Sequence, residues 1–327
     1  MVVFSQVVIW GYAPDEKNHT HHHIHKGLYR AFKHLGYKVY WVHQQNMLDH
    51  ETKQNIEIVP DTLFIVEHQR QKNLPIRDDC YYLLHNFYWD IEKKWLKFNG
   101  WKYKGFNDLA QKGRVVNLQV NRRDFYTEDK EFIDKERFYY CDTKNHRLFL
   151  PWATDLMPDE IEENKTIVSK LLNKRKNKIW IVGTLVDSWK ELQKIGRRRK
   201  IPVEVNGGFS QRVSDEANIR MVRESWFSPA VQRFDQVNPG YIPCRIFKNI
   251  SYGVMGVTNS PHVNALFNNK LIYDQNLNGL YDKMLKWDEQ ELETKQNIIL
   301  ELMDEVKLHH TYINRIGEII KFFDRLQ

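Results

Sequence analysis

Histidines gather near the start of the sequence, at a spacing that could support chemistry. Residues 19–25 read HTHHHIH, and His21 and His25 would share one face of a helix because they lie four residues apart. A neutral imidazole can accept a proton from a hydroxyl group, and two imidazoles at this spacing can bind a metal. The zinc-protease pattern needs glutamate after the first histidine, where this chain has His22, so we predict no metal site. The alternative for this stretch is a solvated polar loop.

A further histidine, His85, lies in the stretch CYYLLHNF at 80–87. We predict a strand that ends at His85, and the site residues of α/β proteins lie at the carboxyl ends of parallel strands. His85, His21 and His25 are therefore our candidates for a catalytic base. For His85, the alternative is a histidine whose hydrogen bonds are satisfied within the core.

The stretch GYIPCRIFKNISYGVMGVTNS, at 240–260, combines apolar runs with two cations. We predict a helix from Pro243 to Gly253, because proline suits the first turn of a helix and glycine its end. The first N–H groups of a helix attract phosphate, and Arg245 and Lys248 add full positive charges near that end. The stretch therefore predicts a diphosphate-binding site. The other residues assigned to this site are Tyr241, Ile242, Pro243, Cys244, Ile246 and Phe247.

A pair of glycines, Gly207 and Gly208, follows the predicted strand in VEVNGGFSQR. Glycines at the end of a strand allow the backbone to approach a ligand closely. We therefore assign both to the same binding site. The alternative is a plain tight turn.

Two sets of alternating strands and helices must position these residues. In the first set, predicted strands at 7–12 and 38–43 enclose a helix over 24–37, which makes a strand–helix–strand unit with parallel strands. Further strands are predicted at 61–68, 80–87 and 113–120. This half of the chain is therefore expected to form a parallel sheet with covering helices.

After a highly charged segment at 157–178, the same pattern starts again. Strands are predicted at 178–185, 201–208 and 271–274, with helices between them and a helical tail over 279–327. The fold class predicted is α/β, with two Rossmann-like doubly wound domains facing a cleft and a hinge near 151–165. Ligands bind in such crevices, at the carboxyl ends of the strands.

Composition and charge narrow the class of protein. The formal net charge of +7 suits a polyanionic partner such as nucleic acid, anionic lipid or the phosphates of a nucleotide. Cys80, Cys141 and Cys244 lie far apart, so neither a zinc ribbon nor a disulfide framework is indicated. No apolar run is long enough to span a membrane, and the first residues read as a strand rather than a signal peptide. We expect a cytoplasmic protein without a transmembrane segment.

The segment from Pro243 to Gly253 resembles the donor-binding part of GT-B glycosyltransferases. Many members of this family carry P-x-[KR]-x-[FL]-E-Y-L-A-x-G-x-P-V, and this chain reads PCRIFKNISYGVMGV. Pro243, Arg245, Phe247, Ile250 and Gly253 fall in register with that pattern.

One position departs from the family pattern: the glutamate that contacts sugar or ribose hydroxyls in the family is Lys248 here. A lysine cannot accept a hydrogen bond from a hydroxyl, so donor recognition is expected to differ, with Lys248 pairing with a phosphate. The resemblance also implies that Ser228 and Gln232, just ahead of the motif, line the pocket for the base and ribose.

The resemblance implies a domain plan. Residues 1–155 would form the acceptor domain, 156–178 a linker and 179–310 the nucleotide-sugar donor domain. Residues 311–327 would form a helix that packs back towards the first domain. The family's presence in microbes and viruses makes a viral protein in a host cytoplasm one expectation for location.

The function implied is transfer of a sugar, hexosyl or pentosyl, from a GDP- or UDP-linked donor to a glycan hydroxyl. No cofactor or metal is expected, since the nucleotide sugar is a substrate and protein cations take the place of a metal ion. The alternatives are a non-catalytic nucleotide or polyanion binder, which the lysine at 248 favours, and an epimerase on the same fold. Nucleic acid is not an expected partner, because no nucleic-acid motif is recognised. The oligomeric state cannot be read from the sequence.

Overall fold

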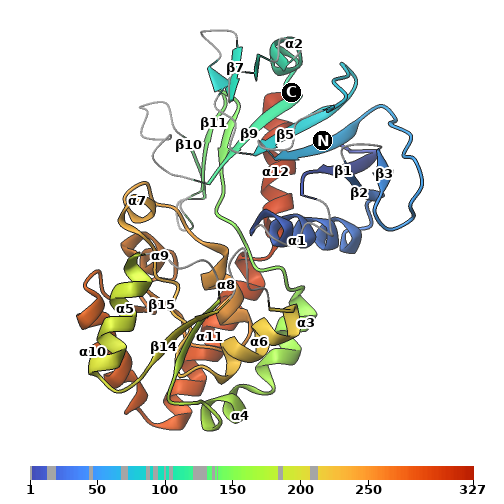
Figure 1. Ribbon diagram of the computed structural model, residues 1–327. Helices are drawn as coiled ribbons and strands as arrows, with labels where there is room; N and C mark the ends of the chain where they lie inside the picture. The colour runs from blue at the N-terminus through green and yellow to red at the C-terminus, as the bar shows by residue number, and fades with distance from the viewer. Residues whose placement is uncertain are drawn as a thin grey trace. The chain divides into compact units, whose positions relative to one another are not determined.

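The chain forms two compact units in the computed structural model (Figure 1). Unit 1 comprises Met1–Pro151 and Tyr312–Gln327, and unit 2 comprises Trp152–Thr311. The structure describes residues 2–12, 20–43, 47–67, 73–85, 89–90, 95–98, 101–102, 106–120, 131–134, 137, 139–182, 187–206 and 213–327. Among these residues, none of the helices combines the length and the apolar character that crossing a bilayer requires.

A sheet of nine strands, in the order β10-β11-β12-β9-β5-β4-β1-β2-β3, organises unit 1. Its neighbours from β2 to β12 pair in parallel, and β3, β10 and β11 join antiparallel at the two edges. The strands are β1 (Gln6–Trp10), β2 (Val39–His43), β3 (Leu48–Asp49), β4 (Thr62–Glu67), β5 (Tyr81–His85), β9 (Val115–Gln119), β10 (Glu131–Asp134), β11 (Tyr139–Asp142) and β12 (Arg147–Phe149). A small antiparallel sheet adds β6 (Trp89–Asp90), β7 (Trp95–Phe98) and β8 (Trp101–Lys102).

The central strands of unit 1 are buried along their whole length. Such continuous apolar runs are typical of parallel strands covered on both faces. The helices of the unit are α1 (Thr20–His34), α2 (Phe106–Gln111) and α12 (Tyr312–Leu326). Helix α12 lies beside α1, as Figure 1 shows in red and blue.

The buried side chain of Arg315 ties α12 to the end of the sheet. Its Nε donates to the carbonyl of Pro151 at 2.8 Å, and its Nη1 to the hydroxyl of Tyr139 at 2.5 Å. These bonds satisfy a guanidinium that would otherwise be costly to bury. The last helix of the chain is thus an integral part of unit 1.

Unit 2 contains two pairs of parallel strands, joined by an extended segment. The pairs are β13 (Ile179–Val182) with β14 (Val203–Asn206), and β15 (Val257–Thr258) with β16 (Ile272–Tyr273). Between them, the backbone N–H of Trp226 donates to Lys178 and that of Ala230 donates to Val257. The buried segment 226–231 therefore hydrogen-bonds beside both pairs, which form two separate two-stranded sheets.

Helices complete unit 2. They are α3 (Pro158–Lys165), α4 (Val168–Asn173), α5 (Asp187–Arg198), α6 (Asp215–Glu224), α7 (Phe234–Val237), α8 (Cys244–Ser251), α9 (Pro261–Leu266), α10 (Leu277–Asp288) and α11 (Leu292–His309). Helix α11 packs against α3, α4 and α8. The segment 156–178, expected from the sequence to be a linker, thus contributes two helices to the body of unit 2.

The predicted α/β class is confirmed, with one difference in the helix predicted from Pro243 to Gly253. The helix runs from Cys244 to Ser251, and Pro243 is its N-cap in an extended conformation. Tyr252 is the C-cap, and Gly253 follows with a φ of +86° that favours glycine. The strand predicted after it is only two residues long, at Val257–Thr258.

Candidate functional site

Three polar side chains meet at the carboxyl edge of the parallel strands in unit 1. Glu67 is the last residue of β4 and His85 the last of β5, and the two residues are paired in register. His21 comes from the first turn of α1. The arrangement follows from topology, because parallel neighbours end at the same edge and the helix after β1 starts there.

The three side chains lie within reach of one another. His21 Nδ1 is 3.3 Å from Glu67 Oε1, and the rings of His21 and His85 are 4.8 Å apart in an edge-to-face arrangement. One ligand atom from each residue can be chosen so that all three lie within 4.8 Å of one another. Glu67 is fully buried, at 0% exposure, so its negative charge requires a partner at close range. The neighbouring imidazole can provide one, either as imidazolium or as a hydrogen-bond donor.

Sequence reasoning selected both histidines and missed Glu67. The strand prediction at 61–68 ended on His68, which lies outside the described residues, and β4 is described as far as Glu67. The signal that identifies Glu67 is an acidic residue at the end of an otherwise apolar parallel strand, a position where burial is expected.

His25, the third candidate base, serves a different purpose. It is buried at 1% exposure, and a side chain in place of Gly11 would overlap its ring. Burial, together with the charge of nearby His21, lowers the pKa of His25 to about 3. The imidazole is therefore neutral at pH 7, and its packing against β1 and Trp41 fixes α1 on the sheet.

In unit 2, the amino end of α8 carries the predicted binding residues. Pro243 provides no side-chain cap for α8, and within the first turn the N–H of Ile246 donates to the carbonyl of Pro243 at 3.3 Å. The amino end of a helix carries partial positive charge, which favours an anion there. Ile246 and Phe247 are fully buried, and the ring of Phe247 lies 4.8 Å from that of His310. The side chains of these two residues and of the buried Ile242 anchor the helix in the core.

The two cations of α8 have different surroundings. The guanidinium of Arg245 stacks 4.7 Å above the ring of Trp189 on α5, and burial lowers the pKa of the arginine. Lys248 Nζ lies 3.2 Å from Asp155 Oδ2, and both side chains are largely buried. Burial alone lowers the pKa of Lys248, but the attraction of Asp155 outweighs it and the pKa is raised. The positive charge of Lys248 is therefore neutralised by the carboxylate of Asp155.

Ser228 and Gln232 hold the segment that precedes α8. The hydroxyl of Ser228 donates to the carbonyl of Val222 at 3.1 Å, and its carbonyl accepts from Asn249 at 2.7 Å. The backbone of Gln232 exchanges two hydrogen bonds with the amide of Asn259, at 2.8 and 2.9 Å. Ser228 and Gln232 are both buried, and their hydrogen bonds hold the segment before α8 in place.

One half of the side-chain amide of Gln232 has no hydrogen-bond partner among the described residues. Its Nε2 donates to the carbonyl of Tyr241 at 2.9 Å, in the loop that leads into α8. Its Oε1 is buried and accepts no hydrogen bond within the described residues, and Nδ2 of Asn206, at the end of β14, likewise donates none there. Buried amide groups are nearly always hydrogen-bonded, so the side-chain amides of Gln232 and Asn206 are candidates for contact with a ligand.

The remaining predicted residues are Tyr241 before α8, Cys244 in its first turn, and the glycine pair after β14. Burial raises the pKa of both the Cys244 thiol and the Tyr241 hydroxyl, so both stay protonated at neutral pH. Gly207 and Gly208 lie outside the described residues.

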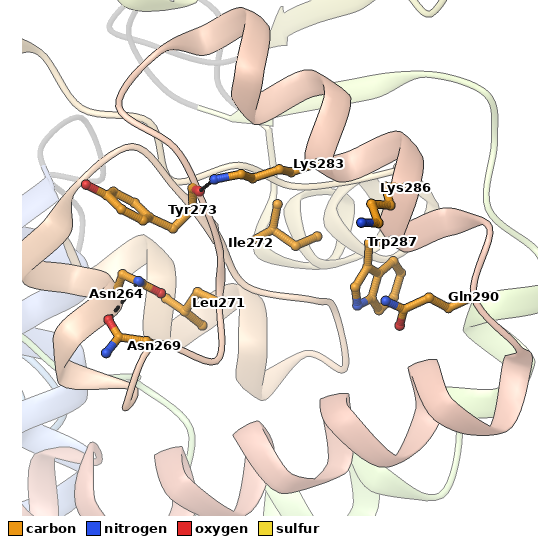
Figure 2. Close-up of a pocket in the computed structure, with 9 residues that line it drawn as sticks. All are labelled: Asn264, Asn269, Leu271, Ile272, Tyr273, Lys283, Lys286, Trp287 and Gln290. Carbon is orange, nitrogen blue, oxygen red and sulfur yellow. Dashed lines mark hydrogen bonds between the residues drawn. The ribbon is translucent and has the colours of Figure 1, made fainter.

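A separate pocket of about 340 Å³ lies in unit 2 beside β16 and α10 (Figure 2). Lys283 donates to the carbonyl of Tyr273 at 2.8 Å along one side, and Asn264 donates to Asn269 at 2.9 Å on another. Among the described residues that were predicted to bind the donor, none lines this pocket. It is therefore distinct from the amino end of α8.

By sequence, the chain matches no family model and no curated protein. By structure, it is similar to an alpha-glucosyltransferase in complex with UDP and a 13-mer DNA containing a HMU base. The TM-score is 0.63 at 10% identity, over 98% of this chain and 100% of the other. A second complex, of an alpha-glucosyltransferase with UDP and a 13-mer DNA containing a central A:G mismatch, gives 0.58 at 8% identity, over 98% and 99%.

An alpha1,3-fucosyltransferase is also similar over 98% of this chain and 89% of the other, at 12% identity and a TM-score of 0.45. At such identities the similarity concerns the fold alone. The chain has the GT-B fold of these glycosyltransferases, as the sequence resemblance predicted.

Proposed function

We propose that the chain transfers a sugar from a nucleoside diphosphate sugar to a hydroxyl group. The observation that carries this proposal is the amino end of α8 in unit 2. There, Arg245 and the first-turn N–H groups adjoin the loop held by Gln232, whose buried Oε1 has an unmet hydrogen-bonding capacity among the described residues.

The diphosphate is the part of the donor that suits this helix end. As the sugar leaves, negative charge develops on the diphosphate, and preorganised N–H groups and a guanidinium stabilise such charge. Arg245 is our candidate for direct contact. Lys248 contributes less, because Asp155 already balances its charge. With protein cations in this role, we expect donor binding to need no metal ion.

Unit 1 supplies the acceptor side of the reaction in this proposal. The acceptor oxygen bonds to the anomeric carbon, the bond from that carbon to the diphosphate oxygen breaks, and the hydroxyl proton must be taken up. His21 is our candidate to accept the proton, since Glu67 lies 3.3 Å away and stabilises the imidazolium that forms. His85 is our candidate to orient the hydroxyl. His25 is too weak a base for either task.

The donor nucleoside is proposed to be uridine, with guanosine as the next choice. Two solved structures that share this fold, with TM-scores of 0.63 and 0.58, are complexes with UDP. For the acceptor, we propose a glycan hydroxyl. One observation favours a second acceptor class: the net charge of +7, on a fold whose solved examples include complexes with DNA, suits an acceptor carried on a nucleic acid.

The experiment that tests the proposal follows release of the nucleoside diphosphate. The purified chain is mixed with UDP- or GDP-sugars and either a panel of free saccharides or a 13-mer DNA containing an HMU base. We expect diphosphate release that depends on an acceptor and falls sharply in His21→Ala. His34→Ala is the matched control, because His34 lies on the same helix and is exposed.

Two results would contradict the proposal. Intact nucleotide sugar that binds but is never consumed would indicate a binding protein. Conversion of the donor sugar with no acceptor present would indicate an epimerase.

A further inference from the structure

We propose that His21, Glu67 and His85 bind one divalent transition-metal ion, for which Zn²⁺ is the first candidate. This goes against the expectation from the sequence that the chain binds no metal. Binding of the ion is argued from the three side chains and does not depend on the proposed function.

The donor set suits a transition metal. Two imidazoles and one carboxylate are ligands that zinc and its neighbours accept, whereas Mg²⁺ and Ca²⁺ prefer oxygen ligands throughout. Three protein ligands also leave a coordination position for a small molecule, which is the pattern of open zinc sites. The residues come from β4, β5 and α1, so the scaffold beneath the site is rigid.

The distances are close to those that a bound ion requires. The three ligand atoms lie within 4.8 Å of one another. At metal–ligand distances of about 2.0–2.2 Å, two ligands can be at most about 4.4 Å apart, so the cluster must contract by roughly half an ångström. Rotation of the imidazoles about their last side-chain torsion can supply this, because that torsion has broad minima.

Burial favours a cation at this place. Glu67 is fully buried and the side chain of His21 is only 14% exposed. A buried carboxylate is costly unless a positive charge compensates it, and a divalent ion does so while using both imidazoles in their neutral form.

A consequence follows for catalysis, and this part alone rests on the proposed function. An imidazole nitrogen that coordinates an ion has no lone pair left to accept a proton. Binding of Zn²⁺ to His21 is therefore expected to inhibit sugar transfer, and a chelator should restore it. The same cluster would then serve as an inhibitory metal site.

The test measures Zn²⁺ binding to the full chain by calorimetry, with no sugar or nucleotide present. We expect one ion per chain in the wild type, and at least tenfold weaker binding in Glu67→Gln and in His85→Asn. His34→Ala, at an exposed position of α1, should bind as the wild type does. Circular dichroism of each variant checks that it is folded.

Co²⁺ provides a second readout on the unaltered protein, because its visible absorption reports imidazole and carboxylate ligands in a site of low coordination number. Absence of stoichiometric Zn²⁺ binding and of a Co²⁺ spectrum in the wild type would overturn the proposal. So would binding that persists unchanged in both variants. If the ion binds and no transfer activity is found with any donor, the metal site stands and the proposed function fails.

Discussion

The carboxyl edges of the strands in unit 1 and unit 2 are built alike and carry opposite chemistry. In unit 1, Glu67 and His85 end neighbouring strands and His21 begins a helix. In unit 2, Asn206 ends a strand and Arg245 lies in the first turn of α8. The shared topology gathers polar groups at one edge of each sheet. The residue types then decide what the edge suits: a proton or a metal cation in unit 1, and an anion in unit 2.

The two edges also differ in how they balance a buried charge. Glu67 is paired with the imidazole of His21, which can serve as a proton acceptor or as a metal ligand, whereas Lys248 is paired with Asp155 in a permanent ion pair. An imidazole partner leaves the edge open to chemistry. A permanent pair makes a fixed structural element.

The largest loss of stability is expected from breaking the ion pair between Lys248 and Asp155. Asp155→Ala would leave the buried ammonium of Lys248 without its partner, which costs about 3–5 kcal/mol of unfolding free energy in comparable cases. Urea unfolding measures the loss. The double variant Asp155→Leu/Lys248→Met should recover much of it, since no buried charge remains. If Asp155→Ala is as stable as the wild type, the ion pair between Lys248 and Asp155 does not stabilise the fold, and the contrast drawn between the two edges fails.

A smaller effect is expected from pH, through His25 in unit 1. The unfolded chain takes up a proton near pH 6.5 and the folded chain only near pH 3, because burial lowers the pKa of His25, so between these values the unfolded state binds more protons. Stability is therefore full above pH 6.5 and falls as pH decreases, by about 2 kcal/mol between pH 6.5 and 5.

Urea unfolding of the wild type and of His25→Gln at these two pH values isolates this contribution. The variant should show a shallower dependence, and the exposed His34→Gln should follow the wild type. Equal slopes in all three proteins would mean that His25 is not held neutral by burial.

Sequence patterns predicted the fold and part of the candidate site. The α/β class followed from alternating strands and helices, and Trp10, Phe64 and Leu84, from three of the predicted apolar strands, lie on buried parallel strands. His21 and His85 were selected because they adjoin the ends of predicted elements. Local patterns were sufficient for these features, because alternation and apolar runs are properties of neighbouring residues.

Other features could not be predicted because they depend on contacts distant in sequence. Asp155 lies 93 residues from Lys248, and nothing local to α8 indicates that its lysine is balanced. Ser228 resembled a ligand-binding residue by position, and its hydrogen bonds to α6 and α8 are visible only in three dimensions. The register of β4 with β5, which brings Glu67 beside His85, is likewise a property of the folded sheet.

The measurement that tests the central claim most directly is calorimetric binding of UDP and GDP to the wild type and to Arg245→Ala. The account predicts that a nucleoside diphosphate binds without metal, and that the variant binds it at least tenfold more weakly, a loss of about 1.4 kcal/mol or more. Arg233→Ala is the control, because Arg233 is an exposed arginine of the same unit, paired with Asp235. The account is contradicted if neither nucleotide binds to the wild type, or if Arg245→Ala binds the nucleotide as tightly as Arg233→Ala does.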